Sequence, residues 1–180
     1  MNYKEQLLKE HSRRNTDKIA KAIGNNADDF KQIVDIIYNG EAPLPQRAAW
    51  ILAVVNAKHP ELLTPYIPLF INTVKQFNID AIKRNVMVVM ATKVIPKKLQ
   101  AKLINICFEF MQSPTETVVV KVHAMQVIAN LAKEHPELTG ELMLMIEDQL
   151  PRNTEAFKAR ARMIIKELNK QEKLKKSIIN

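Results

Sequence analysis

Four segments of the chain, each starting 37 residues after the one before, decide its fold. They read RAAWILAVVNA (47–57), RNVMVVMATKV (84–94), KVHAMQVIANL (121–131) and KARARMIIKEL (158–168). The fourth, seventh, eighth and eleventh positions are apolar in every segment. Residues at this spacing form one stripe along an α-helix. The sequence therefore predicts the same amphipathic helix four times, with a constant repeat length.

Further helices are predicted between and before these segments. Their apolar patterns cover 62–77, 97–112 and 136–149 between the repeats, and 3–11, 15–23 and 26–38 upstream. Pro65 and Pro68 are expected in the first turn of their helix, where a proline is tolerated because that N–H lacks a partner. The β-branched run 118–122 resembles a strand, but its place in the 37-residue register favours helix. The short turns predict antiparallel neighbours.

A pair of such helices cannot bury its apolar face alone, so we expect the pairs to stack on one another. The predicted fold is all-α, an α-α superhelix (a right-handed solenoid) of about four helix pairs plus N-terminal helices. The 180 residues are predicted to form a single domain. It would contain N-terminal capping helices (1–25), the repeats (26–169) and a basic C-terminal tail (170–180).

The repeated segments resemble a known family. QRAAWILAVV (46–55), IKRNVMVVMA (82–91), VKVHAMQVIA (120–129) and FKARARMIIKEL (157–168) look like the second helix of HEAT repeats, where a hydrophobic residue and a basic residue precede a helix rich in small residues. The resemblance covers about residues 26–169 and implies an armadillo-like α-solenoid. The chain is also similar to small bacterial HEAT-like proteins without an established role, some labelled adenylosuccinate lyase. The lyase signature, a Met-Pro-x-Lys-x-Asn-Pro run, is absent.

A basic residue opens each repeated segment and defines a predicted basic ladder. Its members are Arg47, Arg84, Lys121 and Lys158, and the nearby Lys83, Arg160 and Arg162 would add to it. In typical HEAT repeats the matching arginine pairs with an aspartate six residues earlier, and here only Glu41 offers a carboxylate at that offset. The ladder would bind phosphates or acidic side chains. Alternatively, carbonyl groups or acids such as Asp80 satisfy these cations within the chain.

Trp50 is the only tryptophan and lies in an apolar column of the repeat. Core packing is the favoured interpretation, and stacking on a nucleic-acid base is the alternative. HEAT-like DNA glycosylases combine such an aromatic residue with an aspartate. No carboxylate lies one helical turn from Trp50, so that activity would need a distant acid such as Asp35.

The remaining reactive residues predict neither a metal site nor a cofactor. The four histidines are scattered, and His59 and His135 each precede a proline between two helices, where capping explains them better than metal binding. The single cysteine, Cys107, excludes an internal disulfide and is expected to be a core thiol. No apolar run approaches the roughly 20 residues that cross a bilayer. With a polar N-terminal segment, this predicts a cytoplasmic protein.

The net charge of +8 favours an anionic partner. Most of it falls in residues 152–180, which carry nine Lys/Arg against three Glu. We expect a non-enzymatic recognition scaffold that binds a protein partner of acidic character on the concave face of the solenoid. The alternative is nucleic-acid binding through the basic ladder and the C-terminal helix, by contacts to phosphates. An enzyme, mainly a glycosylase-like one, ranks last.

Overall fold

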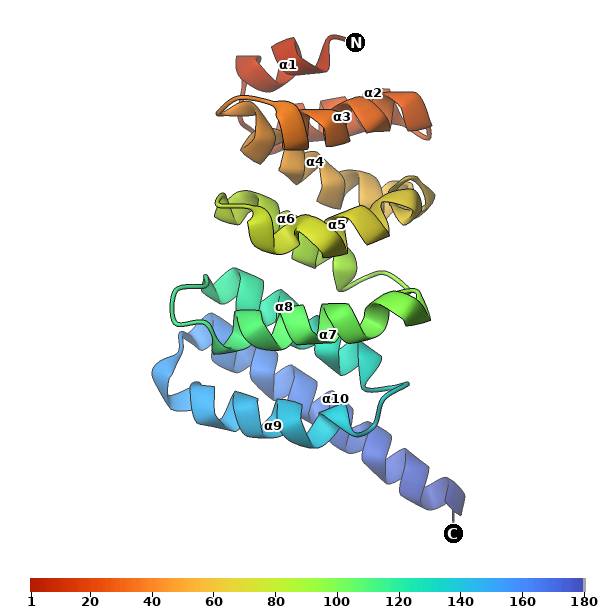
Figure 1. Cartoon of the computed structure of the whole chain (residues 1–180), viewed down its shortest axis with the longest axis vertical. Coiled ribbons are helices and arrows are strands. Elements are labelled where there is room, and N and C mark those ends of the chain that lie inside the picture. The colour runs from red at the N-terminus through yellow and green to blue at the C-terminus, as the bar shows by residue number, and fades with distance from the viewer. Residues whose placement is uncertain (180) are drawn as a thin grey trace. The chain divides into compact units, whose positions relative to one another are not determined.

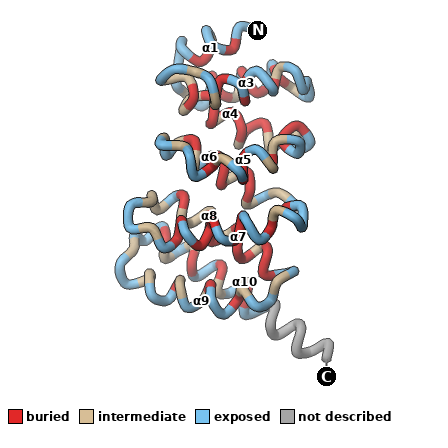
Figure 2. Tube along the Cα trace, viewed as in Figure 1, coloured by how far each residue is buried: buried red, intermediate tan, exposed pale blue. Residues whose placement is uncertain are grey.

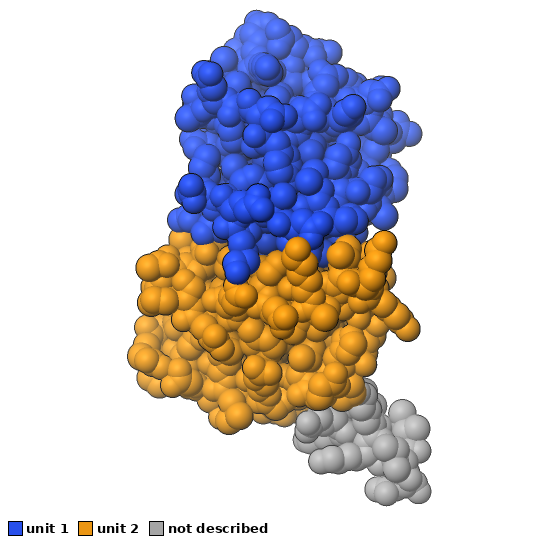
Figure 3. All heavy atoms as spheres, in the orientation of Figure 1, with its two compact units in different colours: residues 1–93 blue, residues 94–180 orange. Residues whose placement is uncertain are grey.

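The structure is a computed structural model that describes the backbone of residues 1–179 and the side chains of residues 1–170. Most of the predicted basic tail (170–180) therefore lies outside the residues whose side chains are described. The described residues form ten α-helices, three short 3₁₀ helices and no strand (Figure 1). They divide into two compact units, residues 1–93 and residues 94–180 (Figure 3). The all-α class and the paired helices are as predicted.

Unit 1 is organised around one central helix, α4. Its elements are α1 (Tyr3–Lys9), α2 (Arg13–Ile23), α3 (Ala27–Asn39), α4 (Leu44–Lys58), η1 (Pro60–Tyr66), α5 (Ile67–Thr73), η2 (Val74–Gln76) and α6 (Asp80–Met90). Helices α1, α2, α3 and α6 all contact α4. The buried residues of α4 consequently lie on several sides of the helix, and they include Ala48, Ile51 and Val55.

The segment predicted as one helix over 62–77 is instead a 3₁₀ helix, a short α-helix and a second 3₁₀ turn. Pro68 lies in the first turn of α5, as predicted. The prediction for Pro65 is wrong, because this residue lies inside the 3₁₀ helix η1. Each proline lacks the N–H that a continuous α-helix needs, so two prolines three residues apart break the segment.

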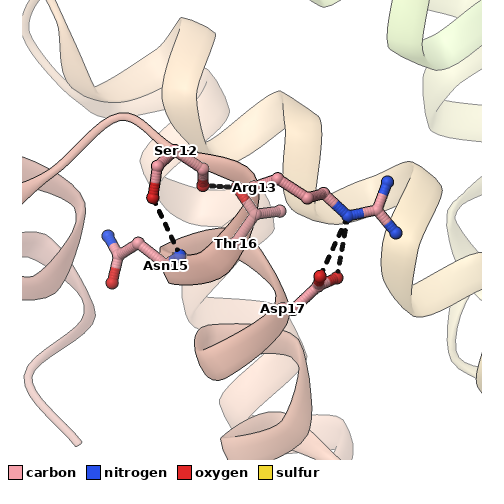
Figure 4. Close-up of polar contacts among 5 residues, drawn as sticks. All are labelled: Ser12, Arg13, Asn15, Thr16 and Asp17. Carbon is pink, nitrogen blue, oxygen red and sulfur yellow. Dashed lines mark hydrogen bonds and ion pairs between the residues drawn. The ribbon is translucent and has the colours of Figure 1, made fainter.

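The N-terminus of α2 is fixed by side chains of the α1–α2 connection (Figure 4). The Oγ atom of Ser12 accepts a hydrogen bond from the Asn15 amide at 3.1 Å, and Thr16 Oγ1 donates to the Ser12 carbonyl at 2.9 Å. This is an N-cap, which satisfies one of the free amides of the first turn. The buried side chain of Asn15 donates to the carbonyls of Gln6 and Glu10, both at 2.8 Å, and so holds α1 against α2.

Unit 2 contains two antiparallel helix pairs. Its elements are α7 (Lys97–Gln112), α8 (Val118–Leu131), α9 (Leu138–Gln149), η3 (Leu150–Arg152) and α10 (Glu155–Ile179). Helix α8 packs against α7, α9 and α10, so it is the central helix of this unit. The run 118–122 is helical, which confirms the prediction made from the register.

Buried residues lie on the facing sides of the helices in each unit (Figure 2). The four apolar columns are the fourth, seventh, eighth and eleventh positions of the repeated segments, and the four repeats bury different numbers of these residues. All four column residues are buried in α8, three are buried in α10, two in α6 and one in α4. The largest departure is Val94, which is 89% exposed because α6 ends at Met90.

Candidate functional site

The first member of the basic ladder, Arg47, is used inside unit 1. Its Nη1 atom donates to the carbonyl oxygen of Leu7 at 2.8 Å and to that of Leu8 at 3.2 Å. These carbonyls belong to the end of α1, where a helix leaves its last acceptors unpaired. The hydrogen bonds of Arg47 therefore go to α1, and the predicted carboxylate partner, Glu41, is not among its acceptors.

The second member, Arg84, is exposed and has no hydrogen bond or ion pair among the residues that the structure describes. Its neighbour Lys83 lies 3.6 Å from the carboxylate of Asp80. The interpretation that acids such as Asp80 satisfy these cations within the chain therefore holds for Lys83, but not for Arg84. The two ladder positions of unit 1 differ completely in environment despite their identical place in the repeat.

The ladder residues of unit 2 also diverge. Lys158 forms an ion pair of 2.9 Å with Glu155. This hydrogen bond lowers the pKa of the Glu155 carboxyl, and the charge of Arg162 adds to the effect. Lys121 is half-buried and has no polar partner within the described part of the chain. Lys121 lines an open groove of about 890 Å³ beside α9.

Arg160 and Arg162 lie on different sides of α10. Arg160 donates to Gln126 of α8 at 3.3 Å, whereas Arg162 lines a hollow with Ile165 and Lys166. Four of the seven predicted cations contact a carbonyl or carboxylate oxygen of the chain itself, as the alternative interpretation expects. These four are Arg47, Lys83, Lys158 and Arg160. Only Arg84, Lys121 and Arg162 lack a hydrogen bond or ion pair in the described residues. A ligand-binding role for the ladder stays a prediction.

Trp50 is half-buried, so it is not among the fully buried residues of the core, and both interpretations of it stay predictions. The edge of its ring system meets His11, with the ring centroids 5.5 Å apart. Asp35 lies elsewhere, where it lines a pocket of about 410 Å³ with Asn2 and Tyr3. Trp50 is not among the residues that line this pocket, and a glycosylase-like activity stays the last-ranked prediction.

The histidines of the two His-Pro-Glu sequences have matching contacts. His59 Nδ1 lies 3.4 Å from Glu61, and His135 Nδ1 lies 3.4 Å from Glu137. His59 is the C-cap of α4 and the N-cap of η1, as predicted, without a side-chain cap hydrogen bond. The prediction is wrong for His135, which lies in the connection between the end of α8 at Leu131 and the start of α9 at Leu138. His135 Nε2 is also 2.7 Å from Gln100 Oε1. In the described residues no three His, Cys, Asp or Glu side chains are grouped as a metal site requires.

One surface was missed by the sequence analysis, and we call it the α8–α10 face. It contains Val119, Gln126, Asn130, Arg160, Met163 and Glu167. Within α8, Gln126 donates a hydrogen bond to Asn130 at 3.1 Å. Gln126 also joins the two helices, because its side chain accepts a hydrogen bond from Arg160 of α10. An ion pair of 3.1 Å between Lys133 and Glu167 joins them again. Met163 is 64% exposed and Val119 is 44% exposed on this face. The sequence offered one indication of this surface: Met163 is apolar but does not lie in any of the four apolar columns of the repeat.

Comparison with known proteins decides the family. The family model of the HEAT repeat domain matches residues 3–169, nearly the whole chain. The chain belongs to the HEAT repeat family. HEAT repeat domains are generally scaffolds for protein interaction. No curated protein and no solved structure matches the chain.

The HEAT match begins at residue 3, so it includes α1 and α2, which were predicted only as capping helices. The arginine–aspartate pair of typical HEAT repeats is replaced here by other contacts. Arg47 donates to carbonyl groups of α1 instead of an aspartate. Lys158 pairs with Glu155, which lies three residues before Lys158 and not six. Among its described residues, this HEAT chain has no helix that is both long and apolar enough to cross a membrane.

Proposed function

We propose that this HEAT repeat chain is a non-enzymatic recognition scaffold that binds an acidic segment of a protein partner. The binding surface is the one formed by the second helices of the pairs, which the sequence predicts to be concave. In unit 2 this surface is the α8–α10 face. The observation that carries the proposal is the exposed side chain of Met163 among basic neighbours.

Met163 has the features of an interface anchor. It is 64% exposed, although the adjacent Ile164 is fully buried. Arg160 and Lys166 lie one helical turn on either side of it, and Glu167, also one turn away, is paired with Lys133. Residues 155–170 of α10 carry five basic and two acidic side chains. An apolar centre with a charged rim is the usual composition of a protein interface, and this rim selects an acidic partner.

Nucleic-acid binding is the competing function. It needs several unpaired cations on one surface, because phosphate contacts supply most of the affinity. The internal partners of Arg47, Lys158 and Arg160 argue against it. The proposed role needs no catalytic residue.

The test is a selection of random twelve-residue peptides displayed on phage against the full chain, with Met163→Glu and Leu69→Glu as comparison variants. Leu69 is 38% exposed in unit 1 and serves as the matched control. We expect peptides enriched in Asp or Glu around an apolar residue, with binding lost in Met163→Glu and kept in Leu69→Glu. Peptides that bind Met163→Glu equally well would overturn the proposal. So would the absence of any selected peptide, together with salt-sensitive binding of labelled duplex DNA that Arg84→Glu abolishes.

A further inference from the structure

Unit 2 contains an open groove between its two pairs of helices. The groove has a volume of about 890 Å³. One wall carries Met111, Glu116, Val118 and Lys121, and the other carries Glu141, Leu144, Asp148 and Arg152. Asp148 pairs with Arg152, and Glu116 accepts a hydrogen bond from the Thr117 amide. The connections α7–α8 and α9–α10 lie at the same end of the unit (Figure 1), and residues of both connections line the groove. All of these residues belong to unit 2, and none is part of the α8–α10 face.

The wall formed by α9 is a single helical stripe with an apolar centre. Glu141, Leu144, Met145 and Asp148 follow the spacing i, i+3, i+4, i+7, so they share one face of the helix. Leu144 is 70% exposed, and Met145 beside it is half-buried. Val118 extends this apolar surface on the opposite wall, and the fully buried Met111 lies behind it.

Two polar groups in the groove lack partners. The half-buried Lys121 has no hydrogen bond or ion pair in the described residues. Removing a charged group from water without a partner is unfavourable, so a carboxylate beside Lys121 would stabilise the site. The Nε2 atom of Gln149 donates to the carbonyl of Met111 at 2.9 Å, which fixes the orientation of its amide. The Oε1 atom of Gln149 is buried and has no donor.

The equivalent junction in unit 1 is filled. There the rings of Tyr38 and Phe77 lie with centroids 5.3 Å apart, and the Tyr38 hydroxyl is 2.6 Å from Thr73 Oγ1. Two repeats further along the chain, Gln112 and Pro151 occupy the positions of Tyr38 and Phe77. The aromatic pair is therefore replaced by residues that cannot close the junction in the same way.

The groove continues along the first helices of the pairs. A second hollow of about 390 Å³ shares Gln112 and Glu141 with it. This hollow is also lined by Ile104 and Phe108 of α7. The two hollows are adjacent because they share Gln112 and Glu141, and their linings mix polar and apolar side chains. An elongated, mixed surface suits an extended peptide segment better than a compact ligand.

We propose that this groove binds an extended peptide segment of a partner protein that carries an acidic residue next to an apolar one. The carboxylate pairs with Lys121, and the apolar side chain packs on Leu144 and Met145. Successive side chains of an extended chain point to opposite sides, so an Asp-Leu pair serves both walls at once. The site is separate from the α8–α10 face, and its occupation goes beyond the function proposed above.

The experiment is a methyl NMR titration of the full chain labelled with ¹³C at the methionine methyl groups. The probe is the blocked peptide acetyl-Gly-Asp-Leu-Gly-amide, and acetyl-Gly-Lys-Leu-Gly-amide is the control. We expect the Met145 signal, assigned with Met145→Leu, to move with the acidic peptide while Met163 stays in place. We expect Lys121→Glu to weaken this binding at least about tenfold, and Lys98→Glu, an exposed lysine on α7, to leave it unchanged.

Several results would overturn the proposal. These are an unmoved Met145 signal up to about 10 mM peptide, equal shifts with the lysine peptide, or unchanged binding in Lys121→Glu. Leu144→Gln provides a second variant, because Leu144 is exposed and its replacement leaves the core intact. A shift of Met163 without Met145 would overturn the groove but support the α8–α10 face. Failure of the two proposals can therefore be told apart in one titration.

Discussion

The guanidinium of Arg47 donates a hydrogen bond of 2.8 Å to the carbonyl oxygen of Leu7 and thereby holds α1 against α4. The acceptor lies in the last turn of a helix of only seven residues. A cation is favourable there because the helix dipole is negative at this end and the last carbonyls lack amide partners. Arg47 is therefore a structural residue of unit 1, although it has the same register position as the exposed Arg84.

Replacement of Arg47 by alanine should destabilise unit 1. We expect Arg47→Ala to lower the free energy of unfolding by about 2 kcal/mol, the usual value for a hydrogen bond from a charged group. Arg84→Ala is the matched control and should change it by less than about 0.5 kcal/mol, because Arg84 is exposed and has no partner in the described residues. Urea denaturation followed by circular dichroism measures both. Equal losses in the two variants would contradict the role of Arg47.

The 37-residue period predicted the helices most accurately where each repeat packs against other repeats. Helix α7 spans Lys97–Gln112, the range predicted from the sequence. In α8 the column residues Ala124, Val127, Ile128 and Leu131 are all buried. Helix α8 packs against α7, α9 and α10 within unit 2, so its apolar stripe is buried by neighbours that its periodicity already implies.

The period could not predict contacts made by elements outside it. Helix α4 packs against α1 and α2, which do not belong to the four repeated segments, and its buried face is displaced so that Trp50 is half-buried. The ladder shows the same limit for polar residues, because Arg47 finds its acceptors in α1 and Lys158 in its own first turn. A shared register position determines where a residue lies on its helix. The neighbours that satisfy it depend on the packing.

The cap at Ser12 should contribute more stability than the ion pair beside it. Loss of an N-cap hydroxyl costs about 1 kcal/mol, so Ser12→Ala should lower the free energy of unfolding by that amount. Arg13 pairs with Asp17 at 3.0 Å, but both side chains are largely exposed. Arg13→Ala should therefore cost less than about 0.5 kcal/mol. Urea titrations of the two variants provide the comparison, and a larger loss in Arg13→Ala would show that the cap is not the main contact.

Cys107 should be unreactive in the folded protein. Its side chain is fully buried, and burial raises the pKa of its thiol. Only the thiolate reacts with disulfide reagents, so both the charge state and the access are unfavourable. We expect no labelling by Ellman's reagent under native conditions and one thiol per chain in concentrated urea. Rapid stoichiometric labelling of the folded chain would mean that α7 opens readily.

The stability of unit 1 should fall at alkaline pH through Tyr3. Burial and the carboxylate of Asp29, which accepts a hydrogen bond from the hydroxyl, raise the pKa of Tyr3 to about 12 from an ordinary value of 10. The folded state therefore holds this proton in a range where the unfolded chain has released it. The resulting stabilisation is fully present below pH 10 and is lost as the pH rises through about 12.

Tyr3→Phe removes this proton, so its free energy of unfolding should fall less steeply over that range than that of the unmodified chain. Asp29→Asn keeps the phenol but removes the carboxylate, so the fall should still begin near pH 10 but end at a lower pH and be smaller in total. Urea denaturation at a series of alkaline pH values measures the slopes. Tyr38 and Tyr66 also have raised pKa values because of burial, and they account for part of the slope that remains. Identical slopes in the unmodified chain and Tyr3→Phe would show that the folded state does not retain the proton of Tyr3 in this range.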